Sequence, residues 1–169
     1  EAAAAAAAVE AEVEAAAREV RTNNSVMQRV DALQRLANIA AARGAPPLVS
    51  WDVGGPLYSV LDRLGGSFRA AQGDEMKRAE AEAEAAAKVL AALSFARRNA
   101  YGISALGSKT CALGSISAVW QLLLMLRQGQ RAYAREWAAT ALANLAAAAG
   151  GADNQIHIQR YLLALLDPT

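Results

Sequence analysis

The chain has 169 residues, of which 54% are apolar, and alanine dominates that fraction. A chain of this length and composition buries a core, as one globular domain or as about four helical repeats, so a disordered tail is excluded. Its 17 basic and 16 acidic residues are dispersed and leave a net charge of +1, which lacks the positive excess that nucleic-acid binding requires.

The composition also predicts the fold class. Alanine has the highest intrinsic helix propensity, and only 12 glycines and 4 prolines interrupt the chain, so we expect an all-α fold with almost no sheet. The longest apolar run, residues 112–126, is too short to cross a membrane, and no transmembrane segment is predicted. The single cysteine, Cys111, excludes an internal disulfide and a thiolate metal site.

Residues 1–21 are nearly all Ala, Glu, Val and Arg, a pattern that predicts one exposed helix. A semi-rigid spacer without a function of its own is the simpler interpretation of such a composition. Asn23, Asn24 and Ser25 then break the helix, and one of them should cap the next. The predicted organisation is an Ala/Glu-rich helix or spacer over residues 1–22, followed by helical repeats over residues 23–169.

A pattern recurs in this second part. Three segments overlay as helices with a small residue at the same phase: residues 31–40 (DALQRLANIA), 85–94 (AAAKVLAALS) and 137–146 (WAATALANLA). Their equivalent leucines are Leu36, Leu90 and Leu142. A second apolar helix follows each segment, and a short Asn-led element precedes two of these, at residues 99–107 and 154–158. The repeating unit is therefore predicted to contain three helices.

This order of helices, ending in Leu-Ala-Asn-Leu in the best unit at residues 99–149, resembles the armadillo repeat. The resemblance covers most of the chain after Asn24 and implies a right-handed superhelical α-solenoid of about three to four irregular repeats. The equivalent leucines are 54 and 52 residues apart, more than the about 40–47 of this class. Inserts at residues 73–84, which should lengthen a helix, and at residues 108–115 account for the excess, and Pro46 and Pro47 make the first unit irregular.

Each helix group carries more apolar surface than it can bury alone, so stacked neighbours should share one core. Its predicted members are Val30, Leu33, Ala37, Leu90, Leu93, Leu142 and Leu145. The chain stops inside a repeat, which leaves an apolar end open unless a cap or a partner covers it, so we expect either a truncated chain or an assembly. It also begins at Glu1 and not at Met, so we expect a processed mature protein or a fragment whose targeting sequence has been lost. The localisation therefore stays open between a cytoplasmic and an organellar site within the cell.

The resemblance also implies a binding site, because the last helix of each armadillo unit lines a concave groove where Asn side chains bind an extended peptide. Asn38 and Asn144 match those positions, and the same helix faces carry further polar and aromatic groups. The predicted partner-binding residues are Gln34, Asn38, Lys88, Tyr133, Trp137, Thr140 and Asn144. Two alternatives stay open: the asparagines only tie neighbouring segments together, and Trp137 belongs to the packed face.

The predicted groove departs from the family pattern in two respects, one in the middle unit and one in all three units. Ala92 stands where Asn is expected, and the Trp that importin-α-like repeats place four residues earlier is replaced by Gln34, Lys88 and Thr140. A nuclear-import receptor is therefore disfavoured.

Evidence for catalysis is weak. Residues 102–110 (GISALGSKT) nearly match a phosphate-binding loop, but Ser108 displaces the lysine and no strand precedes them, so nucleotide binding is rejected. His157 lacks a nucleophile nearby and is read as structural. Glu80, Glu82 and Glu84 are typical of a solvated helix face. We predict no catalytic residue, no metal site, no cofactor and no enzymatic activity.

The leading hypothesis is a scaffold that binds a segment of a protein partner in the groove. The alternative is a structural accessory subunit of a large protein complex, for example a photosynthetic or respiratory one, embedded through its Ala-rich helices. An enzyme or small-molecule domain is the least favoured.

Overall fold

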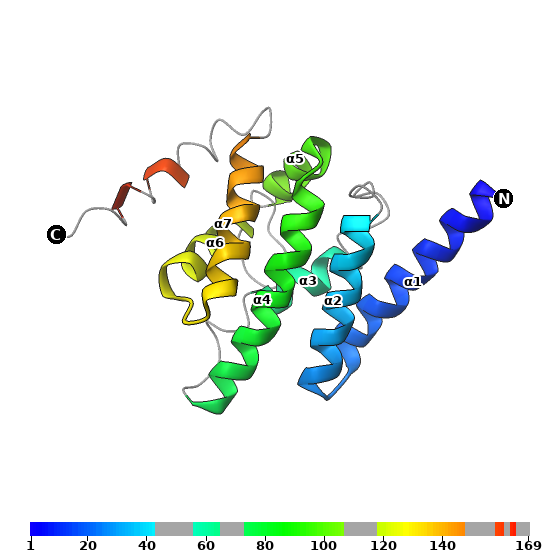
Figure 1. The fold of residues 1–169 in the computed structure, drawn as a ribbon, viewed down its shortest axis with the longest axis horizontal. Helices are drawn as coiled ribbons and strands as arrows, with labels where there is room; N and C mark the ends of the chain where they lie inside the picture. The colour runs from blue at the N-terminus through cyan, green and yellow to red at the C-terminus, as the bar shows by residue number, and fades with distance from the viewer. Residues whose placement is uncertain (43–55, 65–72, 107–117, 148–157, 161–162, 165–169) are drawn as a thin grey trace.

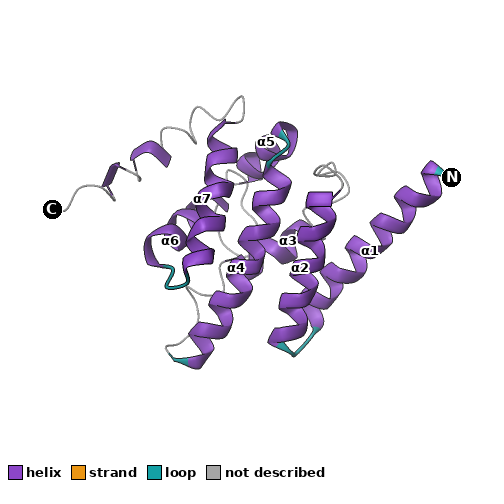
Figure 2. Cartoon of the chain, viewed as in Figure 1, coloured by secondary structure: helices purple, strands orange, loops and turns teal. Residues whose placement is uncertain are grey.

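The computed structural model describes residues 1–42, 56–64, 73–106, 118–147, 158–160 and 163–164. Its helices are α1 (Ala2–Thr22), α2 (Val26–Ala42), α3 (Pro56–Leu64), α4 (Asp74–Ser94), α5 (Arg97–Leu106), α6 (Ala118–Gln128) and α7 (Ala132–Ala147). The residues just named contain no strand (Figure 2). The predicted all-α fold is thus confirmed, and α4 begins within the insert that was expected to lengthen a helix.

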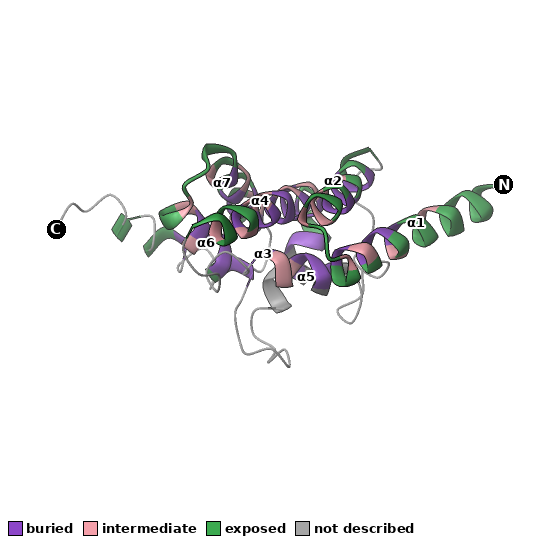
Figure 3. Cartoon of the chain, turned by 90° about the horizontal axis from the view of Figure 1, so that it is seen from below, coloured by how far each residue is buried: buried purple, intermediate pink, exposed green. Residues whose placement is uncertain are grey.

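The helices lie in two layers. Helices α2, α4 and α7 lie side by side in one layer, with α4 in the middle, and all three run in the same direction (Figure 1). Helices α1, α3, α5 and α6 form the other layer (Figure 3). Each helix of the first layer packs against a helix that precedes it in the chain, in the pairs α1 with α2, α3 with α4, and α6 with α7.

The core lies between these layers and centres on α4. This helix contacts α2, α3, α5 and α7 and buries mainly small residues such as Ala83, Ala86 and Ala87 together with Leu90, which lets its neighbours approach closely. The predicted core is confirmed. Leu33, Ala37, Leu90, Leu93, Leu142 and Leu145 are buried, and Val30 packs half-buried against them.

The N-terminal helix belongs to this core more fully than the sequence suggested. Its first turns are exposed, as expected, but its second half buries Val13, Ala16, Ala17 and Val20 against α2 and α3. The helix ends at Thr22, where Asn23 takes an extended conformation. The hydroxyl of Ser25 then accepts a hydrogen bond from the N–H of Gln28 at 3.5 Å, so one of the three predicted residues caps α2.

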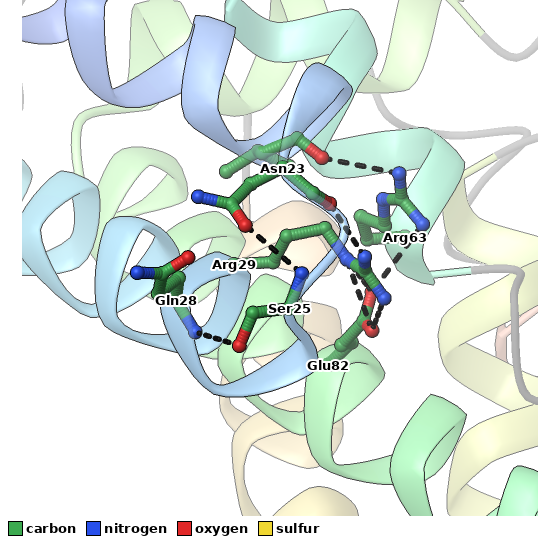
Figure 4. Close-up of polar contacts among 7 residues, drawn as sticks. Asn23, Ser25, Gln28, Arg29, Arg63 and Glu82 are labelled. Atoms are coloured by element: carbon green, nitrogen blue, oxygen red, sulfur yellow. Dashed lines mark hydrogen bonds and ion pairs between the residues drawn. The ribbon is translucent and has the colours of Figure 1, made fainter.

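The carboxylate of Glu82 joins α4 to three other parts of the chain (Figure 4). It accepts hydrogen bonds from the guanidinium of Arg29 on α2, with both carboxylate oxygens 3.2 Å from Nε, and it pairs with Arg63 of α3 at 3.4 Å. Arg29 also donates to the carbonyl of Asn23 at 2.7 Å, and Arg63 donates to the carbonyl of Val20 at 3.1 Å. Two arginines therefore link one carboxylate to the last turn of α1 and to the α1–α2 turn.

A second carboxylate, that of Glu80, fixes the start of α7. It accepts hydrogen bonds from the backbone N–H groups of Gln130 and Arg131, the latter at 3.1 Å. Backbone donors at a helix start lack partners within the helix, and negative charge is stabilised there. Glu84 pairs with the side chain of Arg131, and this hydrogen bond raises the pKa of that arginine.

The expectation of a solvated face for these acids is wrong for Glu80 and Glu82, which are 6% and 4% exposed. Residues two apart point to opposite sides of a helix, while residues four apart share a side. Glu80 and Glu84 therefore face α7, and Glu82 faces α2 and α3. A helix with neighbours on both sides has no fully solvated face.

Several residues interpreted from the sequence lie outside the described part of the chain. They are Pro46, Pro47, Cys111, His157 and residues 107–110, which include the lysine of the segment 102–110.

We expect Glu82→Gln to lower the free energy of unfolding by about 3 kcal/mol, because removing one member of a buried ion pair leaves the other charge unpaired. The matched control is Glu75→Gln, in the exposed first turn of the same helix. Urea denaturation followed by circular dichroism measures both. Equal midpoints for the two variants would show that the Glu82 contacts contribute nothing to stability.

Candidate functional site

The outer side of the first layer carries most of the predicted binding residues, and we call it the α2–α4–α7 face. It is formed by Gln34 and Asn38 of α2, Lys88 and Ala92 of α4, and Tyr133 and Thr140 of α7. Asn38, Tyr133 and Thr140 are exposed, whereas Gln34, Lys88 and Ala92 are half-buried. In Figure 3 the exposed and half-buried parts of α2, α4 and α7 lie along this side.

Lys88 and Trp137 meet across the junction of α4 and α7. The ammonium nitrogen of Lys88 lies 5.5 Å from the centre of the Trp137 ring, within the range of a cation–π interaction. Trp137 is half-buried and packs against the core. Most of this aromatic surface is therefore used to join the two helices, as the alternative interpretation expected.

The two asparagines have different surroundings. The side-chain amide of Asn144 donates hydrogen bonds to the carbonyl of Ala91 at 3.1 Å and to the hydroxyl of Ser94 at 3.3 Å. Carbonyls near a helix end lack partners within the helix, so this amide ties α7 to the end of α4. Asn38 is exposed, and its side chain has no hydrogen-bond partner among the described residues. Asn144 thus has the tying role, and Asn38 keeps its amide available.

The other predicted binding residues of α7 differ in how accessible their functional groups are. Tyr133 is 66% exposed, and its ring is an accessible aromatic surface. The hydroxyl of Thr140 donates to the carbonyl of Glu136 at 3.0 Å, so part of its hydrogen-bonding capacity is used within its own helix. On α4, Ala85 is buried and does not reach the face.

The sequence interpretation missed Phe95, which is 82% exposed. Phe95 follows the last residue of α4 in a helical conformation, with φ −59° and ψ −36°, and seven residues separate it from Lys88. Seven residues make about two helical turns, so both side chains belong to one stripe about 10 Å long. The seven-residue spacing from Lys88 was the sequence signal that could have placed Phe95 on this stripe. Another aromatic residue, Trp120, is 45% exposed on α6.

The described residues contain no group of three or more His, Cys, Asp or Glu side chains that could hold a metal ion. None of the helices described has the length and apolarity needed to span a bilayer.

Comparisons of the chain with protein-family models, with curated proteins and with solved structures each return no match.

Asn144 and Asn38 should differ in how much their side chains contribute to the free energy of unfolding. We expect Asn144→Ala to lower the free energy of unfolding by about 1 kcal/mol, because two hydrogen bonds between α7 and α4 are lost. Asn38→Ala, the same change at an exposed position, should leave it within about 0.5 kcal/mol of the original protein. Chemical denaturation of both variants measures this, and a larger loss for Asn38→Ala would reverse the assignment.

Proposed function

We propose that the chain is a protein-interaction scaffold, built as a short armadillo-like solenoid, that binds an extended segment of a partner protein across the α2–α4–α7 face. The observation that carries this proposal is the order of the helices. Three sequence-equivalent helices lie parallel in one layer, and each is backed by a helix that precedes it. This is the arrangement that the armadillo resemblance implies for the helices of a groove.

The dimensions of the face suit an extended segment. Packed helices have axes about 8–10 Å apart, so the distance from α2 to α7 is roughly 20 Å. An extended chain covers that distance with about six residues. Backbone groups of such a segment need hydrogen-bond partners, which the exposed amide of Asn38 can supply, and the ring of Tyr133 offers an aromatic contact at the other helix. The proposal includes no catalytic role and no cofactor.

A permanent subunit of a larger assembly is the second candidate, and one observation favours it. Trp120 is 45% exposed on α6, which belongs to the layer opposite the face. A permanent interface would be centred on such an apolar position and not on Asn38 and Tyr133.

The double variant Asn38→Ala/Tyr133→Ala tests the scaffold. Both side chains are exposed, so the fold should be retained. Loss of a tyrosine at a binding hot spot costs about 2 kcal/mol, so we expect the affinity for the native partner to fall roughly 30-fold. The measurement is affinity isolation from the source with mass spectrometry, followed by titration calorimetry with the partner recovered.

The matched control is Arg127→Ala/Gln128→Ala, which changes two exposed residues of α6 in the opposite layer. The control should retain the partner. If instead the Asn38→Ala/Tyr133→Ala variant recovers one fixed set of chains in equal amounts, as the original protein does, the proposed groove is wrong and the subunit interpretation holds.

A further inference from the structure

Charge is distributed unevenly along the three helices of the α2–α4–α7 face. Their C-terminal parts and the α4–α5 turn, residues 34–42, 85–99 and 137–147, contain no carboxylate. The cations in these ranges are Arg35, Lys88, Arg97 and Arg98. The N-terminal parts of the same helices carry the acids: Asp31, Asp74, Glu75, Glu80, Glu82, Glu84 and Glu136. The end of the molecule formed by these C-terminal parts and the start of α5 is therefore positive.

Among the described residues, most of these cations have no carboxylate partner. Arg35 pairs with Glu19 of α1, whereas Lys88 lies over the Trp137 ring and forms no ion pair in the described part of the chain. Arg97 and Arg98 are exposed, and within the described residues neither forms an ion pair or hydrogen bond through its side chain. As far as the structure describes the chain, these three cations can therefore pair with negative groups of another molecule.

The fold itself gives no reason for Arg97 and Arg98. They occupy the first turn of α5, which contains no acidic residue. The start of a helix is the positive end of its dipole and disfavours cations. These two charges therefore cost local stability where they stand, which is expected of residues that serve binding.

Phe95 adds an apolar contact to this positive end. It lies on the same stripe of α4 as Lys88 and two residues before Arg97, and it is 82% exposed. An exposed aromatic ring beside cations complements a segment in which acidic and apolar side chains alternate, because alternate side chains of an extended chain point to the same side.

We propose that the partner segment is acidic, with carboxylates that pair with Lys88, Arg97 and Arg98 and an apolar side chain that packs on Phe95. This inference rests on the proposed function and adds the chemistry of the partner. The charges would set the rate of association and the choice of partner more than they set the affinity.

Fluorescence anisotropy with three labelled peptides tests the proposal: one alternates Glu and Leu, the second Gln and Leu, and the third Lys and Leu. We expect the acidic peptide to bind about tenfold more tightly than the neutral one and the basic peptide not to bind, with affinity falling as salt is raised. The triple variant Lys88→Ala/Arg97→Ala/Arg98→Ala should bind the acidic peptide about tenfold more weakly. The matched control, Arg18→Ala/Arg78→Ala/Arg127→Ala, removes three exposed cations elsewhere and should bind it unchanged.

The outcomes separate this inference from the proposed function. Equal binding of the acidic and neutral peptides, lost in Asn38→Ala/Tyr133→Ala, would overturn the acidic partner and leave the scaffold. Equal weakening by both triple variants, or equal binding of heparin or single-stranded RNA, would mean attraction of any polyanion and would also overturn it. Absence of binding by every peptide counts against the acidic segment, whereas the scaffold fails only if the native partner is retained by Asn38→Ala/Tyr133→Ala.

Discussion

The position of α4 depends on carboxylates that this helix places in the interior on two opposite sides. Glu82 is held by Arg29 and Arg63, and Glu80 by the backbone donors at the start of α7. Buried charges must be paired, so these contacts admit few alternative positions of α2 and α7 beside α4. The alanines around these acids pack closely, but their side chains are short and interlock little with those of a neighbouring helix. Alone, they would allow one helix to slide along another. The α2–α4–α7 face therefore owes its register to the buried acids.

The positions of the helices followed from the sequence because they depend on periodicity. Leu36, Leu90 and Leu142 recur at the same phase of three helices, and all three are buried. The surroundings of α4 could not be predicted from the sequence. A run of Glu and Ala has the same pattern on a surface helix and on a helix with charged partners on both sides. Only the neighbours decide between the two, and those are contributed by α2, α3 and α7, which lie far away in the sequence. The second half of α1 was missed for the same reason.

The candidate site shows a similar limit. Asn38 and Asn144 are equivalent by position, yet the end of α4 lies within hydrogen-bonding distance of Asn144, while Asn38 is exposed. Sequence equivalence places a residue on a helix face but does not say which neighbouring backbone groups lack partners. Phe95 is the converse case. Its spacing from Lys88 places it on the same stripe of α4, but spacing alone does not say whether an aromatic residue at a helix end is buried, and in the structure Phe95 is 82% exposed.

In the proposed complex, the division of charge in this chain links stability to recognition. Glu80 and Glu82 hold helices together inside the molecule, whereas Lys88, Arg97 and Arg98 pair with no carboxylate of the described residues. A helix that is fixed on two sides loses little further freedom when a partner binds, so less of the binding free energy is spent on ordering the scaffold. The same helix thus supplies rigid support through its N-terminal acids and a positive, aromatic end beyond Lys88. Weakening the buried ion pairs should therefore loosen the binding face as well as the fold, although none of the buried acids touches the partner in the proposed complex.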